Sequence, residues 1–110
     1  MGLVAEVISA IQKTVEGVSF RQIKCDPGGG EIKNADHYQS LGEDTAPVEG
    51  DFACLVPTAR TGGCAVVGYV DPKNPPSVSP GEKKIFGRDD GGTKVCEVYL
   101  RNDGDVIVQN

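Results

Sequence analysis

The chain has 110 residues with 15 Gly, 7 Pro, no Trp and 38% hydrophobic residues, so it forms one small domain or a domain with an appendage. Its 16 Asp and Glu outnumber its 11 Lys and Arg, which gives a net charge of -5. Nucleic acid is therefore not expected as a partner, because affinity for a phosphate backbone comes from clustered Lys and Arg.

Residues 1–16 are predicted to form a short amphipathic N-terminal helix. Apolar residues recur there at spacings of three and four, and Gly17 follows as a stop signal. The apolar positions are Leu3, Val4, Val7, Ile8, Ile11 and Val15. The first six residues lack the basic region of a secretory signal, and no apolar run reaches the ~20 residues of a membrane span. We therefore expect synthesis in a cytoplasm.

Residues 17–72 are predicted to form a small antiparallel barrel resembling the oligonucleotide/oligosaccharide-binding (OB) fold, although an SH3-like barrel would show much the same pattern. Turn residues and alternation place strands at 18–25, 31–38, 52–57 and 64–70, with a polar loop at 39–51 and a turn at 58–63. The last two strands are apolar on both faces, which predicts that each is covered on both sides.

Residues 73–80 are predicted to be a proline-rich linker, since four prolines fall within Asp71–Pro80 and such segments stay extended. Residues 81–110 then form a three-stranded meander, or stem, with strands at 82–88, 94–101 and 105–109. One face of the stem is apolar and is the predicted oligomer interface, made of Cys96, Val98, Leu100, Val106 and Val108. The alternative is that the meander folds back onto its own barrel.

No catalytic, metal-binding or cofactor-binding site is predicted, and the protein is not expected to be an enzyme. His37 is the only histidine and has no nucleophile nearby in the sequence. The carboxylates Glu43, Asp44, Glu49 and Asp51 share one polar loop, which favours a solvated acidic loop over a glycosidase pair. Asp26–Gly30 and Asp103–Asp105 are predicted to be turns, not a phosphate cradle or a calcium loop.

The four cysteines, Cys25, Cys54, Cys64 and Cys96, lie in apolar or strand-like contexts. None of their spacings suits a zinc knuckle. We expect them to be reduced and packed as small hydrophobic side chains, with disulfides as the alternative.

Three segments together resemble the OB-domain spike and baseplate assembly proteins (protein V-like) of tailed phages. They are Gly68–Pro72 at the end of the barrel, Pro80–Asp89 after the linker, and Val98–Val108 with its Asn-Asp-Gly turn. The resemblance covers roughly residues 17–110. It implies a homotrimer in which three barrels surround an axis and the C-terminal strands interlock into a β-prism.

The chain departs from that family in ending where longer members begin their repeated prism strands, and it lacks their His-x-His pair. A short hub, tip or adaptor subunit therefore fits better than a complete needle. The resemblance implies a structural protein of the virion tail, made in a bacterial cytoplasm, that takes part in tail assembly and host envelope attachment or penetration. Its partners would be other tail and baseplate proteins and, transiently, the host outer membrane. The alternative is an OB-fold module that binds single-stranded nucleic acid or glycan.

Overall fold

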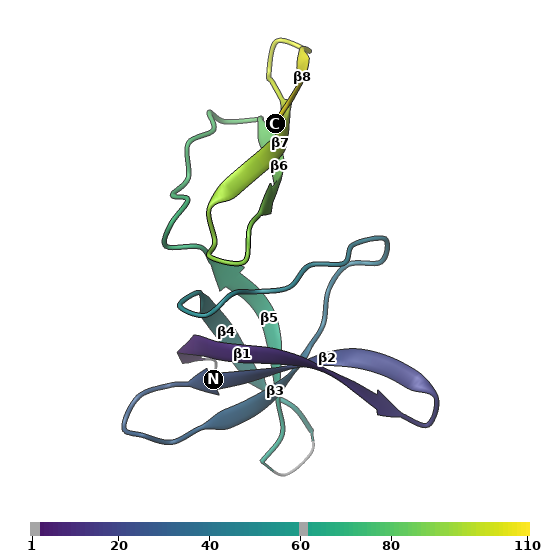
Figure 1. Ribbon diagram of the computed structural model, residues 1–110, viewed down its shortest axis with the longest axis vertical. Helices are drawn as coiled ribbons and strands as arrows, with labels where there is room; N and C mark the ends of the chain where they lie inside the picture. The colour runs from purple at the N-terminus through teal and green to yellow at the C-terminus, as the bar shows by residue number, and fades with distance from the viewer. Residues whose placement is uncertain (1–2, 60–61) are drawn as a thin grey trace. The chain divides into compact units, whose positions relative to one another are not determined.

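In a computed structural model, residues 3–59 and 62–110 are described, and they form eight β-strands in two sheets (Figure 1). The chain divides into two compact units, Met1–Pro72 and Lys73–Asn110. None of the described residues forms a helix, so no helix long and apolar enough to cross a membrane occurs among them. The prediction of a mainly β fold is confirmed.

The first unit contains five strands that pair in the order β1-β2-β3-β5-β4, and β4 pairs again with β1. The pairing therefore runs around a ring. The ring is weakest between β3 and β5, which run parallel and pair at only two positions, so the sheet is not sealed there as a complete barrel. The strands are β1 (Leu3–Val15), β2 (Val18–Asp26), β3 (Lys33–His37), β4 (Phe52–Pro57) and β5 (Cys64–Val70). The four strands predicted in this region are confirmed.

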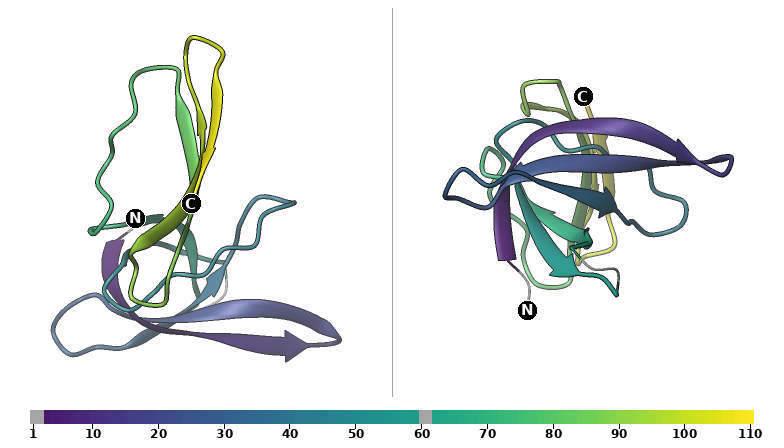
Figure 2. Two further views of the ribbon diagram at one scale, coloured as in Figure 1. Left: turned by 45° about the horizontal axis from the view of Figure 1, so that its top comes forward. Right: turned by 90° about the horizontal axis from the view of Figure 1, so that it is seen from below.

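The predicted N-terminal helix is wrong: Leu3–Val15 is the longest strand, while Met1 and Gly2 lie outside the described residues. β1 and β2 form a hairpin, which Figure 2 shows as two long adjacent arrows. Val15 pairs with Val18 across a two-residue turn in which Glu16 has φ 51° and Gly17 has φ 79°. Both positive values are typical of a type I′ turn. Gly17 therefore helps to reverse the chain between β1 and β2 and does not end a helix.

The hydrophobic core lies inside the ring of the first unit. Alternate residues of each strand point inward, and the buried set is Ala5, Val7, Ile23, Cys25, Ala35, Ala53, Leu55 and Val66. The prediction that residues 52–57 are covered on both sides is wrong, because Phe52 and Cys54 on the outer side of β4 are exposed. Val70, opposite Phe52, is also exposed, so the same prediction is wrong for residues 64–70.

The second unit is a three-stranded antiparallel sheet of β6 (Lys83–Arg88), β7 (Lys94–Leu100) and β8 (Val106–Gln109), as the sequence predicts. Residues 73–80 form no strand, and their hydrogen bonds tie them to the sheet. Asn74 Nδ2 donates to the Gly92 carbonyl at 2.9 Å, and Lys84 Nζ donates to Ser77 Oγ at 3.2 Å. The proline-rich segment is thus part of the second unit.

Candidate functional site

The most distinctive surface of the second unit is the apolar face of its sheet, here called the stem face. Val98 on the middle strand pairs with Ile85 on one side and Val108 on the other, and Leu100 pairs with Val106. Directly paired residues share a face of the sheet. The stem face comprises Ile85, Cys96, Val98, Leu100, Val106 and Val108. The structure thus places the five residues of the predicted interface on one surface.

The stem face is largely uncovered within one chain. Ile85 is 57% exposed, Val106 63% and Val108 74%. Among the described residues, every fully buried apolar side chain belongs to the first unit. The second unit by itself therefore leaves this apolar surface uncovered.

Sequence reasoning missed Ile85 of the stem face and Gly87, which lies opposite Cys96. Both follow from pairing residues 83–88 with 94–100 across the Asp89–Gly92 turn. Cys96 lies opposite Gly87, and a Cβ atom added at Gly87 would lie 3.0 Å from Cys96 Sγ. The absence of a side chain at Gly87 therefore gives the Cys96 thiol its room.

The opposite face of the same sheet carries paired charged side chains beside Phe86, Tyr99 and Ile107. Glu97 accepts from Lys94 at 2.5 Å and lies 3.8 Å from Lys84, whose ammonium also sits 4.6 Å from the centre of the Tyr99 ring. The hydrogen bond from Lys94, assisted by the charge of Lys84, lowers the pKa of Glu97. The paired charges of Lys84, Lys94 and Glu97 therefore distinguish this face from the stem face.

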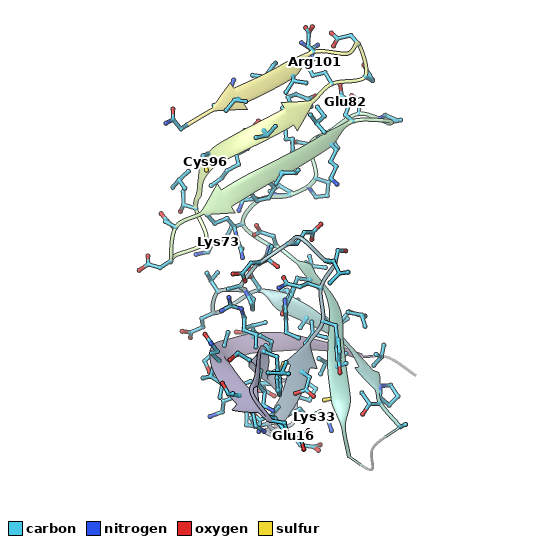
Figure 3. All side chains as sticks on the ribbon, turned by 90° about the vertical axis from the view of Figure 1, so that its right-hand side faces the viewer. Glu16, Lys33, Lys73, Glu82, Cys96 and Arg101 are labelled. Carbon is cyan, nitrogen blue, oxygen red and sulfur yellow. The ribbon has the colours of Figure 1, made fainter. Side chains whose placement is uncertain are left out.

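Glu82 fastens the proline-rich segment to the far end of this sheet. Its carboxylate accepts from the Tyr99 hydroxyl, from the Ser79 backbone N–H at 3.0 Å and from the Asn102 backbone N–H at 3.1 Å. Figure 3 shows Glu82 and Arg101 at the end of the sheet away from Cys96. The Tyr99 hydrogen bond, followed by the two backbone donors, lowers the pKa of Glu82.

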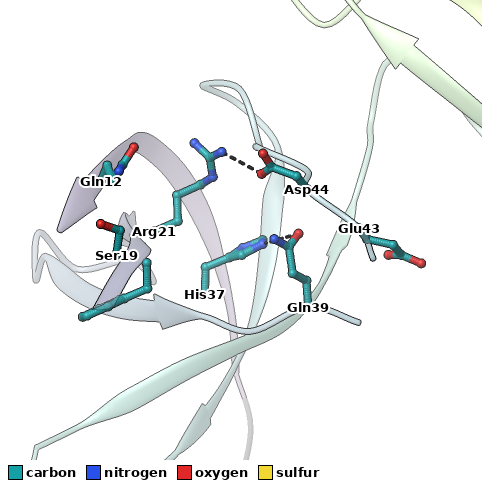
Figure 4. A pocket seen from close by; sticks show the side chains of 8 residues that line it. Gln12, Ser19, Arg21, His37, Gln39, Glu43 and Asp44 are labelled. Atoms are coloured by element: carbon teal, nitrogen blue, oxygen red, sulfur yellow. Dashed lines mark hydrogen bonds and ion pairs between the residues drawn. The ribbon is translucent and has the colours of Figure 1, made fainter. Parts of the chain in front are cut away.

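The first unit contains a polar cleft between the β1–β2 hairpin and the loop at residues 39–51, here called the loop cleft. It has a volume of about 440 Å³. Gln12, Ser19 and Arg21 line it from the hairpin, and Gln39, Glu43 and Asp44 line it from the loop side (Figure 4). An ion pair of 2.9 Å between Arg21 Nη2 and Asp44 Oδ1 connects its two sides.

His37 lies at the cleft and is only 8% exposed. The Thr45 N–H donates to Gln39 Oε1 at 3.0 Å, which identifies that atom as an acceptor. His37 Nε2, 3.2 Å from the same oxygen, is therefore the protonated ring nitrogen, and Nδ1 accepts from the Tyr69 hydroxyl at 2.5 Å. Burial raises the pKa of Tyr69 far above its ordinary value. His37 thus acts as a structural link between the loop and β5.

Two of the loop carboxylates, Asp51 and Asp44, are held by partners within the first unit. Asp51 is buried, with 3% of its surface exposed, and its Oδ2 accepts from the Val48 N–H at 2.9 Å. Asp44 is held by Arg21. The prediction of a solvated acidic loop is therefore wrong for Asp51, because this carboxylate caps the backbone of its own loop.

The two turns considered as ligand sites are closed by their own side chains. Asp26 Oδ1 accepts from the Gly28 N–H at 2.8 Å, and Asp103 Oδ1 accepts from the Asp105 N–H at 2.9 Å. Strand β3, not a helix, follows the first turn. In residues 3–59 and 62–110, no three His, Cys, Asp or Glu side chains gather as a metal-binding group.

All four cysteines are free thiols in the structure, but they differ in environment. Cys25 is buried in the core, and burial, with Cys64 nearby, raises the pKa of its thiol. Cys54 and Cys96 are exposed, so the expectation that every cysteine is packed inside the chain is wrong for these two. Both lie on outward apolar surfaces, Cys54 beside Phe52 and Cys96 on the stem face.

Comparisons with protein-family models, with curated proteins and with solved structures gave no match for this chain.

Proposed function

We propose that this chain is a subunit of a homotrimer that serves as a structural component of a phage tail tip, as a central spike, baseplate hub or adaptor. The observation that carries the proposal is the exposed stem face, which one chain leaves uncovered. Burying one Val or Leu side chain is worth roughly 1.5–3 kcal/mol, so several such positions in each copy favour association over the monomer.

The first unit supports the same assignment. A five-stranded, partly open ring in which every pair except β3–β5 is antiparallel agrees with an OB-type domain. The order of the two units, ring first and meander second, is the order that the resemblance to phage spike proteins implies. A second apolar surface, formed by Phe52, Cys54 and Val70, gives copies of the first unit a further place to meet.

The proposed role is mechanical. Strands from three copies would bury their stem faces against one another, and the paired polar faces would point to solvent or to neighbouring tail proteins. Such a subunit needs no catalytic group, metal or cofactor. Its place would be the virion tail, where it would act in assembly and in attachment to or penetration of the host envelope.

The test is the mass of the full chain in solution, measured by light scattering at micromolar concentration. We expect three times the chain mass of 11.6 kDa. Cys96 should then react slowly with a thiol reagent in the native protein and rapidly after denaturation. A monomeric mass with a fast-reacting Cys96 would refute the proposal.

A further inference from the structure

The second unit has almost no interior of its own. Among residues 73–110, all of which the structure describes, Gly92 is the only buried residue. The first unit, in contrast, removes the eight apolar side chains of its core from water. Burial of apolar side chains is the main favourable contribution to folding, and it has to exceed the entropy that the chain loses. The first unit meets this condition by itself, whereas the second unit does not.

The second unit also lacks the other means by which short chains become stable. Lys73–Asn110 falls below the roughly 40 residues under which a chain usually needs disulfides, a metal or oligomerisation to fold. A disulfide within the unit is excluded, because Cys96 is its only cysteine. The residues that the structure describes contain no group of three His, Cys, Asp or Glu side chains that could hold a metal ion. Oligomerisation is therefore the means that remains.

The polar contacts of the second unit do not replace a core. Glu97 pairs with Lys94 and Lys84, and Glu82 accepts three hydrogen bonds. Hydrogen bonds and ion pairs of this kind contribute little net free energy to folding, because the unfolded chain forms equivalent bonds with water. These contacts therefore specify the shape of the ordered stem, while the apolar stem face stabilises it only when another surface covers that face.

Strand β8 gives a second, independent reason for expecting a partner. It is an edge strand, because the sheet has the order β6-β7-β8. Charged residues and prolines protect natural edge strands from pairing with other chains, and the other edge, β6, carries Lys83, Lys84 and Arg88. β8 contains no charge and no proline, and its Val106 and Val108 are exposed. A stem that is ordered in a free chain would therefore present an open edge beside an apolar face, which favours aggregation.

We propose that the second unit becomes ordered only when copies of the chain associate, so that the stem folds and the trimer forms in one step. This coupling rests on the proposed trimer and adds when its interface comes into existence. A free chain would consist of a folded first unit and a disordered tail, which presents neither the stem face nor the edge of β8. Assembly would then depend steeply on concentration, because the tails have to meet before any of them buries its apolar residues.

The test measures order and mass in the same samples of the full chain. Hydrogen–deuterium exchange read by mass spectrometry reports the protection of each peptide, and sedimentation velocity reports the mass. After dilution to the monomer, peptides from residues 83–109 should exchange like an unfolded chain, whereas peptides that contain Ile23 or Leu55 should stay protected. At about 100 times the concentration of half-assembly, exchange in residues 83–109 should be slowed by at least roughly 100-fold.

Val108→Asp makes the same measurement possible if the parent chain stays assembled at the lowest concentration. Val108 is 74% exposed, so a stem that folds by itself would lose few contacts through this substitution. If folding requires assembly, the variant should be monomeric, with unprotected peptides over residues 83–109 and an unchanged first unit. The matched control is Ile107→Asp, which places the same charge on the opposite face of β8 and should keep the mass and the protection of the parent chain.

The possible failures are distinguishable. A monomer, of the parent chain or of Val108→Asp, in which residues 83–109 stay protected would overturn the coupling, while a trimeric mass of the parent chain at higher concentration would leave the proposed function standing. A parent chain that is monomeric at every concentration would refute the trimer and the coupling together. Equal loss of protection in Ile107→Asp and Val108→Asp would also overturn the coupling, because the stem would then respond to any charge on β8 and not to the covering of its apolar face.

Discussion

The two units of this chain place similar apolar strands in opposite environments. Strand β4 of the first unit and strand β7 of the second both carry apolar residues at alternate positions, so each has an apolar face. Leu55 on β4 is 1% exposed, whereas Leu100 on β7 is 37% exposed. Composition alone does not explain this difference.

The difference lies in the curvature and number of the strands. Five strands that pair around a ring enclose an inner face, so the residues that point into the ring are removed from water without help from another chain. Three strands in a meander enclose nothing, and a sheet of this kind needs a partner surface. The first unit therefore has a core of its own, whereas the stem face would become part of a core only in the proposed trimer.

The largest effect should come from a charge on the stem face. Val98→Asp would place like charges close together in the proposed trimer and leave them without water, so assembly should be lost. Ile107→Asp is the matched control, since Ile107 pairs with Tyr99 and therefore lies on the opposite face of the same sheet. Light scattering should give a monomer for the first variant and the parent mass for the second. Equal masses in both variants would contradict the assignment of this interface.

Truncating one leucine in each unit separates folding from assembly. Leu55→Ala opens a cavity in the first core and should lower the free energy of unfolding by roughly 2–5 kcal/mol. Leu100→Ala should instead make thermal unfolding depend more steeply on protein concentration, because in the proposed trimer its contacts would be made between chains. Melting curves at several concentrations distinguish the two effects. A concentration-independent loss with Leu100→Ala would mean that Leu100 belongs to a core within one chain.

Most strands were predictable because turn chemistry and alternation point the same way. Gly-rich turns at 26–30, 89–92 and 102–104 mark hairpin ends, and the strands beside them are confirmed. The stem face followed from the spacing of Cys96, Val98 and Leu100. Ile85 required the register, which is fixed only once residues 83–88 are paired with 94–100.

The failures arose where one pattern suits two structures. The apolar residues of β1 fit a helical spacing, yet Val4, Val7, Ile8, Ile11 and Val15 are β-branched and favour strands. Pairing with β2 and β4 decides the outcome, and a local pattern does not contain that information. In the same way, the apolar outer side of β4 predicts that this side is buried, but the local pattern does not show whether the same chain or another one would bury it. The loop cleft could not be foreseen, because Gln12 and Asp44 meet only through the hairpin.

An effect of intermediate size is expected at Glu16 and Gly17, where a substitution tests whether residues 3–15 form a strand of a hairpin and not a helix. Glu16 is the one non-glycine residue with positive φ among the described residues, and such a backbone costs roughly 1–2 kcal/mol for most side chains. Asn tolerates this conformation and is favoured before Gly in type I′ turns. Glu16→Asn should therefore raise the free energy of unfolding by about 0.5–1 kcal/mol. Glu31→Asn, the control at a position without positive φ, should not raise the free energy of unfolding. A loss of stability in Glu16→Asn would contradict the hairpin turn and favour the predicted helix.

The smallest expected effect is the response of Glu82 to acidic pH, and it is confined to the second unit. The pKa of Glu82 is lower in the folded chain than in the unfolded one, because Tyr99, Ser79 and Asn102 donate to its ionised form. Its contribution is therefore present above the ordinary carboxyl pKa and is lost as the pH falls through the folded pKa. The Asn102 backbone amide donates to Glu82 and not to Glu97, so its NMR signal reports Glu82 alone. That signal should move in acid in the parent chain and stay nearly fixed in Glu82→Gln, while Glu97→Gln keeps the parent profile. If the signal moves alike in Glu82→Gln, some other group holds the proline-rich segment against the sheet.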